Sequence, residues 1–118
     1  MSQLNGIIEK LVREGKKSVR QRETGPRLRG GIEGFELAKN LTSVDEFDRM
    51  ISERHQHELE LKAQQVDADT YWEYRYATVQ LEYCRDILIA HKSMRGEQTS
   101  DRPISCRACI KYSELFPN

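Results

Sequence analysis

Long apolar runs are missing from this sequence. No stretch approaches the roughly 20 consecutive apolar residues that a helix needs to cross a bilayer, and hydrophobic residues make up only 37% of the chain. The opening stretch, MSQLNGIIEKLVREG, contains acids and lacks the continuous apolar segment of a secretory signal. The sequence therefore predicts a soluble, cytoplasmic protein that does not bind membranes.

Cysteine is also scarce, because the chain has only three. An odd and sparse set does not make a disulfide framework, and it fits a reducing compartment. Cys106 and Cys109 have the spacing of half a zinc site, but no second ligand pair accompanies them. We therefore expect no metal, and a small zinc-stabilised domain built on these two cysteines is the weaker alternative.

Motifs that carry catalysis are absent as well. The stretch HELEL, residues 57–61, departs from the zinc-protease pattern because Leu61 stands where the second histidine ligand is needed. No nucleophile elbow, phosphate-binding loop or dinucleotide fingerprint occurs. The expectation is a protein that is not an enzyme and uses no cofactor.

Charge is balanced overall but segregated along the chain. Residues 1–30 hold eight Lys/Arg and three Glu, a net charge of +5, whereas residues 45–86 hold eleven acids and five Lys/Arg, a net charge of −6. Such asymmetry indicates either packing of one part on the other or an oppositely charged partner.

The N-terminal third predicts two short helices separated by an irregular segment. Apolar residues at helical spacing favour a helix over residues 3–14, ending at Gly15. Residues 16–31 combine basic side chains with Gly-Pro and Gly-Gly pairs, which predicts a loop or mobile arm. Another short helix is expected over residues 31–40.

The remainder predicts a long antiparallel helical hairpin over about 44–64 and 70–94. Each helix opens with the pattern of a capping box, Ser43 with Glu46 and Thr70 with Glu73. A last short helix is expected over about 103–115, with Pro103 in its first turn. No segment predicts a β-strand, so residues 1–118 should form one all-α domain.

The segment 70–94 carries two apolar stripes, whereas an ordinary surface helix carries one. The first contains Tyr74, Ala77, Leu81, Cys84 and Leu88, and the second contains Trp72, Tyr76, Val79, Tyr83 and Ala90. The second stripe either is covered within the domain or binds a partner. For a partner, the anchors are Trp72, Tyr76 and Tyr83, since aromatic side chains combine a large contact area with a polar tip.

These features favour a non-enzymatic interaction protein: a small regulator, inhibitor or adaptor of the kind found among bacterial and phage accessory proteins. Its partner would be another protein or a second copy of the chain, which would make a homodimer. The alternative is a nucleic-acid-binding protein that contacts phosphates through the basic segment 16–29. Its candidate contacts are Lys16, Lys17, Arg20, Arg22, Arg27 and Arg29.

Overall fold

The computed structural model describes residues 3–94 and 106–116, with side chains over residues 6–93 and 110–116. The described residues form five helices and no strand, so the all-α prediction is confirmed. The helices are α1 (Gln3–Arg22), α2 (Gly25–Ala38), α3 (Val44–Ala63), α4 (Ala68–Met94) and α5 (Cys106–Leu115).

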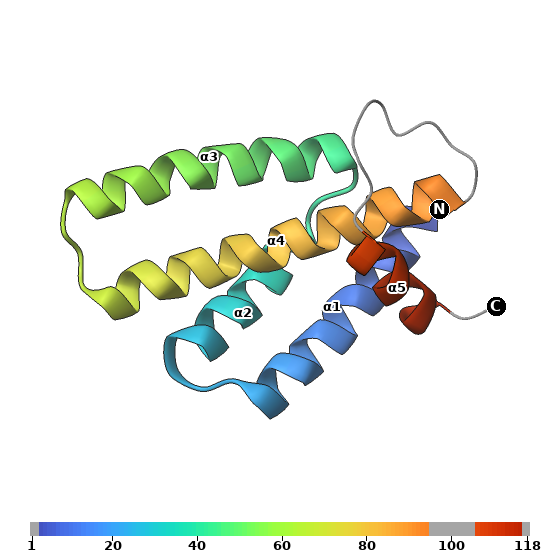
Figure 1. Cartoon of the computed structure of the whole chain (residues 1–118), viewed down its shortest axis with the longest axis horizontal. Coiled ribbons are helices and arrows are strands. Elements are labelled where there is room, and N and C mark those ends of the chain that lie inside the picture. The colour runs from blue at the N-terminus through green and yellow to red at the C-terminus, as the bar shows by residue number, and fades with distance from the viewer. Residues whose placement is uncertain (1–2, 95–105, 117–118) are drawn as a thin grey trace.

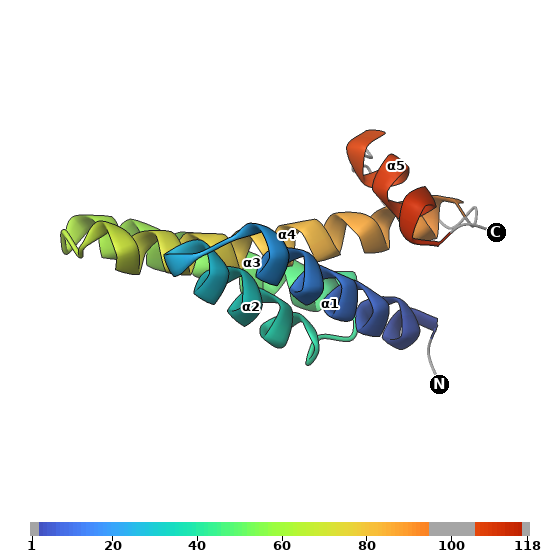
Figure 2. The ribbon, with the colours of Figure 1, turned by 90° about the horizontal axis from the view of Figure 1, so that it is seen from below.

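Helix α4 is the central element (Figure 1). Helix α3 runs antiparallel along one side of it, and α1 and α2 form a second hairpin on another side, with the most extensive helix contact between α2 and α4. Helix α5 lies against the C-terminal part of α4, away from the α3–α4 turn (Figure 2). All four other helices therefore contact α4.

The predicted hairpin of α3 and α4 is confirmed, with one change at its turn. The Ser43 hydroxyl caps α3 by accepting the Glu46 backbone N–H at 3.2 Å. At α4, the Asp67 carboxylate accepts the Thr70 backbone N–H at 2.8 Å, so the helix begins at Ala68. The predicted cap at Thr70 is wrong, because Asp67 is an equally good capping residue and lies three positions earlier.

The loop or mobile arm predicted over residues 16–31 is wrong. Helix α1 continues through Gly15 to Arg22, and α2 begins at Gly25, so only Glu23 and Thr24 connect them. The chain reverses direction there because Gly25 adopts a φ of +62°, a conformation that costs glycine little. The predicted helix over residues 31–40 is the second half of α2.

The sequence-based prediction was wrong here because it treated these glycines as helix ends or loop residues. In the structure they lie inside helices and face neighbouring helices. A Cβ at Gly30 would collide with the backbone carbonyl of Glu73, and one at Gly34 would collide with the carbonyl of Ala77. A Cβ at Gly15 would occupy the space that the Phe35 ring fills. These positions permit close helix packing and do not end helices.

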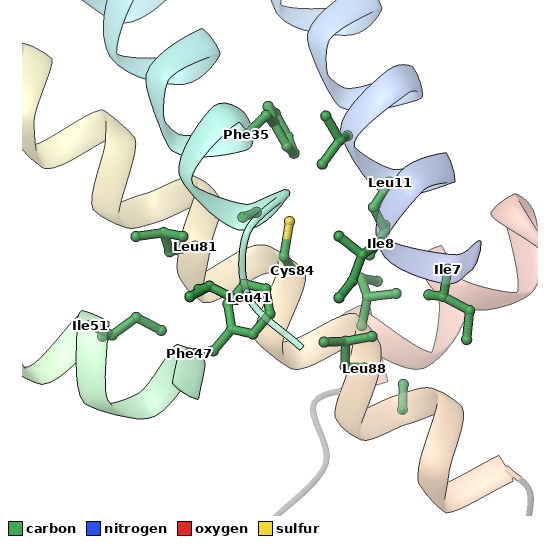
Figure 3. Close-up of a cluster of buried hydrophobic side chains, with 14 of the residues drawn as sticks. Ile7, Ile8, Leu11, Phe35, Leu41, Phe47, Ile51, Leu81, Cys84 and Leu88 are labelled. Carbon is green, nitrogen blue, oxygen red and sulfur yellow. The ribbon is translucent and has the colours of Figure 1, made fainter. Parts of the chain in front are cut away.

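The hydrophobic core lies where α1, α2 and α3 meet α4 (Figure 3). Phe35 and Phe47 are almost completely buried and approach the same segment of α4 from different helices. Around them lie the buried side chains of Ile8, Leu11, Leu41, Ile51, Leu81, Cys84 and Leu88. The core therefore ties α1 and α2 to the α3–α4 hairpin.

Substitution of Gly30 by alanine tests the α2–α4 contact. The added methyl group must displace α2 from the backbone of α4, so Gly30→Ala should lower the free energy of unfolding by about 1–3 kcal/mol, measured by urea denaturation. Gly6→Ala is the matched control, since Gly6 has no neighbour within 4 Å. It should leave stability unchanged or raise it by at most about 1 kcal/mol. Equal effects of the two substitutions would contradict the proposed packing role.

Candidate protein-interaction surface

The first apolar stripe of α4 is covered by α2 and α3. Ala77, Leu81, Cys84 and Leu88 are completely buried. Tyr74, at the edge of this stripe, lies under the Arg54 guanidinium, 3.8 Å from its ring centroid, and 5.0 Å from the His57 ring. This stripe is part of the domain core.

The second stripe is divided along its length. Its C-terminal part is covered, with Ala90 completely buried and Tyr83 half-buried. Its N-terminal part faces solvent, since Trp72 exposes 49% of its surface and Val79 exposes 36%. The C-terminal part of the stripe is therefore covered within the domain, and binding of a partner by the exposed N-terminal part stays a prediction.

Aromatic and cationic side chains gather at the exposed end. The Trp72 ring lies 6.2 Å from the Tyr76 ring and 5.4 Å from the Tyr71 ring, measured between centroids. Arg27 of α2 lies over Tyr76, with its guanidinium carbon 5.1 Å from the ring centroid. We call Trp72, Tyr76, Val79 and Arg27 the aromatic patch.

A solvent-open groove of about 380 Å³ adjoins this patch. Tyr76, Gln80 and Tyr83 of α4 line one side, and a face of α1 that includes Gly15 and Ser18 lines the other. The ring of Phe35, from α2, lies between these walls and contacts Tyr83 edge to face, with centroids 6.4 Å apart. Lys111 and Leu115 of α5 border the groove as well.

Charged groups surround the groove. Arg22, Arg27 and Lys111 line it together with Glu14 and Glu23. Lys111 lies 3.6 Å from Glu114, whereas Arg22 and Arg27 have no carboxylate partner among the described residues. The groove thus combines the aromatic side chains of Tyr76 and Tyr83 with two arginines that form no ion pair with a described carboxylate.

The structure does not place the six basic residues of the segment 16–29 on one face. Lys16 forms an ion pair with Glu36, and Arg29 forms one with Glu73. Arg22 and Arg27 line the groove. Lys17 and Arg20 remain exposed on the outer face of α1, on which Arg13 also lies at helical spacing. We call Arg13, Lys17 and Arg20 the basic row.

Each of the three histidines contacts another side chain. His57 lies 3.0 Å from the Glu60 carboxylate, His55 lies 3.8 Å from Glu82, and His91 lies 2.7 Å from the Tyr112 hydroxyl. Over the described side chains, no group of three His, Cys, Asp or Glu is placed to hold a metal ion. The side chains of Cys106 and Cys109 lie outside the described part, so the zinc hypothesis stays a prediction.

Sequence reasoning missed the α1 and α2 side of this surface. Phe35 was expected in a short helix but not between α1 and α4 beside a groove, and Gly15 was expected to end a helix. The available signal was the spacing of Gly30, Gly34 and Ala38, four residues apart, which marks one helix face of small side chains.

No family model, curated protein or solved structure matches this chain. No helix in the described ranges is both long and apolar enough to cross a membrane.

Tyr83, which lines the groove, makes the stability of the protein depend on pH in the alkaline range. Burial raises the pKa of the Tyr83 phenol to about 12, with smaller contributions from Cys84 and Glu114. Burial likewise raises the pKa of the Cys84 thiol to about 12. Both groups are neutral in the folded protein at pH values where the unfolded chain would ionise, from an ordinary pKa of 9.0 for the thiol and 10.0 for the phenol.

We therefore expect stability to be fully present below pH 9 and to fall as the pH rises towards 12. Tyr83→Phe should reduce this fall, because phenylalanine keeps the ring and removes the ionising group. The measurement is the midpoint of urea denaturation between pH 8 and pH 11. Tyr71→Phe is the control; for it, the same decline as in wild type is expected. An identical pH dependence of Tyr83→Phe and wild type would contradict the role of Tyr83.

Proposed function

We propose that this chain is a non-enzymatic interaction protein, a small regulator, inhibitor or adaptor, that binds a protein partner through the aromatic face of α4. The observation that carries the proposal is the exposure of Trp72, which is 49% solvent-accessible beside Tyr76. Trp and Tyr are enriched among the residues that dominate binding energy at protein interfaces. The partner would contact Trp72 and Tyr76 directly.

Tyr83, the third anchor in this proposal, lines the groove beside the aromatic patch. Its ring is held against Phe35 and its pKa is raised by burial. A side chain of the partner that enters the groove would meet Tyr83 and Tyr76 on the same wall. The aromatic patch and the groove therefore form one continuous contact surface.

Binding of nucleic acid is the second candidate function. The observation in its favour is the basic row on the outer face of α1, where Lys17 and Arg20 make no ion pair with a described residue. Phosphate contacts of this kind give an affinity that falls steeply with salt. The proposed protein interface is largely aromatic, so its affinity should depend less on salt.

Site-specific cross-linking tests the protein-binding proposal. A photoreactive phenylalanine analogue at Trp72 should give a covalent product with a partner in cells that naturally contain the protein. The same analogue at Glu53, on the exposed side of α3, is the control and should give none. A product of twice the mass of the chain would identify a second copy as the partner.

The captured partner is then purified and its affinity measured. Trp72→Ala and Tyr76→Ala should each weaken binding by about tenfold or more, because truncated interface aromatics typically cost more than 1 kcal/mol, while Glu53→Ala should have no effect. Partner affinity that is unchanged in both aromatic variants would disprove the proposal. So would a cross-linked product at Glu53 but not at Trp72.

A further inference from the structure

Two helix faces form the long walls of the groove. The wall from α4 repeats at spacings of four and three residues, through Tyr76, Gln80 and Tyr83. The wall from α1 repeats in the same way, through Leu11, Gly15, Ser18 and Arg22. At 1.5 Å per residue these walls are about 10 and 16 Å long, which matches two to three turns of an α-helix. The lining therefore extends over the length of a short helical segment.

The wall from α1 carries small residues, Gly15 and Ser18, at its centre. Phe35 packs where a larger residue at Gly15 would clash, and Ser18 adds only a small side chain above it. Phe35 is almost completely buried, so the aromatic surface that a partner can reach in the groove comes from the partly exposed rings of Tyr76 and Tyr83. Burial of apolar side chains from a partner on this surface would be favourable, and the groove is open to solvent for their entry.

The charged residues that line the groove indicate which kind of partner segment would bind in it. Arg22 and Arg27 flank the groove without a carboxylate partner in the described chain, and arginine binds carboxylates with two parallel hydrogen bonds. Glu14 and Glu23 also line the groove, and they would repel a continuous phosphate backbone. Discrete carboxylates on a helix can contact the arginines and avoid these acids, so an acidic peptide fits better than a nucleic acid.

We propose that this groove binds an acidic, amphipathic helical segment of a partner protein. Its apolar side chains lie over Tyr76 and Tyr83, and its carboxylates bind Arg22 and Arg27. This inference rests on the proposed function and adds the chemistry of the partner, since it places acidic residues of the partner beside the aromatic patch.

A displayed library of random peptides, each about 16 residues long, tests this proposal on the full chain. Selected peptides should be enriched in Asp and Glu and should carry apolar residues three and four positions apart. The affinity of one selected peptide is then measured by calorimetry for wild type and variants. A selection that yields no such acidic family, or yields basic peptides, would overturn the proposal.

Matched charge reversals locate the site. The double variant Arg22→Glu with Arg27→Glu should weaken peptide binding by about tenfold or more. The double variant Lys17→Glu with Arg20→Glu changes the net charge equally on the outer face of α1, and it should weaken binding by less than about twofold. Equal losses in both double variants would indicate nonspecific attraction and overturn the proposal.

A substitution that changes no charge tests the groove in a second way, and circular dichroism checks that the variant still folds. Ser18→Leu fills the groove with a good helix former and should reduce peptide affinity by about tenfold or more, with no loss of helical circular dichroism. Gln21→Leu, at an exposed position of α1, is its control and should bind as wild type does. Undiminished peptide binding by Ser18→Leu would overturn the proposal.

Two further outcomes separate the alternatives. A labelled oligothymidine that binds more tightly than the selected peptides, and loses affinity in the Arg22→Glu, Arg27→Glu variant, would assign the groove to nucleic acid. A cross-linked partner at Trp72 that binds equally to wild type and Ser18→Leu would refute the groove inference and leave the aromatic-patch function intact.

Discussion

The close approach of α2 to α4 at Gly30 and Gly34 is the contact on which the rest of the structure depends. Because neither residue has a side chain, the backbone of α2 lies directly against the backbone of α4 at Glu73 and Ala77. Phe35 follows Gly34 in the chain and is thereby carried into the core. The same contact sets the position of α1, whose Gly15 accepts the Phe35 ring, and so it also shapes the groove.

The α3–α4 hairpin was predictable because its signals are local. The helix cap at Ser43 depends on a residue three positions away, and the apolar stripe of α4 follows from helical spacing alone. The hairpin of α1 and α2 was not predictable in this way. Glycine is a poor helix former in isolation, and only the proximity of α4 explains why Gly30 and Gly34 lie inside a helix.

The candidate surface was predicted in part for the same reason. Helical periodicity identified Trp72, Tyr76 and Tyr83 as one face, and the structure places Tyr76 and Tyr83 on one wall of the groove with Trp72 beside it. The opposite wall comes from α1, whose continuation past Gly15 was not expected. Local patterns cannot reveal a groove between helices that are distant in sequence.

Helix α1 separates two kinds of surface. Its inner face contributes to the core and to the groove, whereas its outer face carries the basic row. Residues that are neighbours in sequence, such as Arg20 and Arg22, therefore point to different surroundings. A cluster of basic residues in sequence does not define a single binding site when the segment is helical.

The glycines of α2 also bear on the order in which the chain folds. Three glycines in the interior of a 14-residue helix lower its intrinsic stability by about 3 kcal/mol relative to alanine, and isolated helices of this length are already marginal. The α3–α4 hairpin, by contrast, has Phe47 and Ile51 to pack against Leu81 and Leu88. We therefore expect α2 to become stable only on an already formed α4, so that the N-terminal hairpin assembles after the α3–α4 hairpin although it is synthesised first.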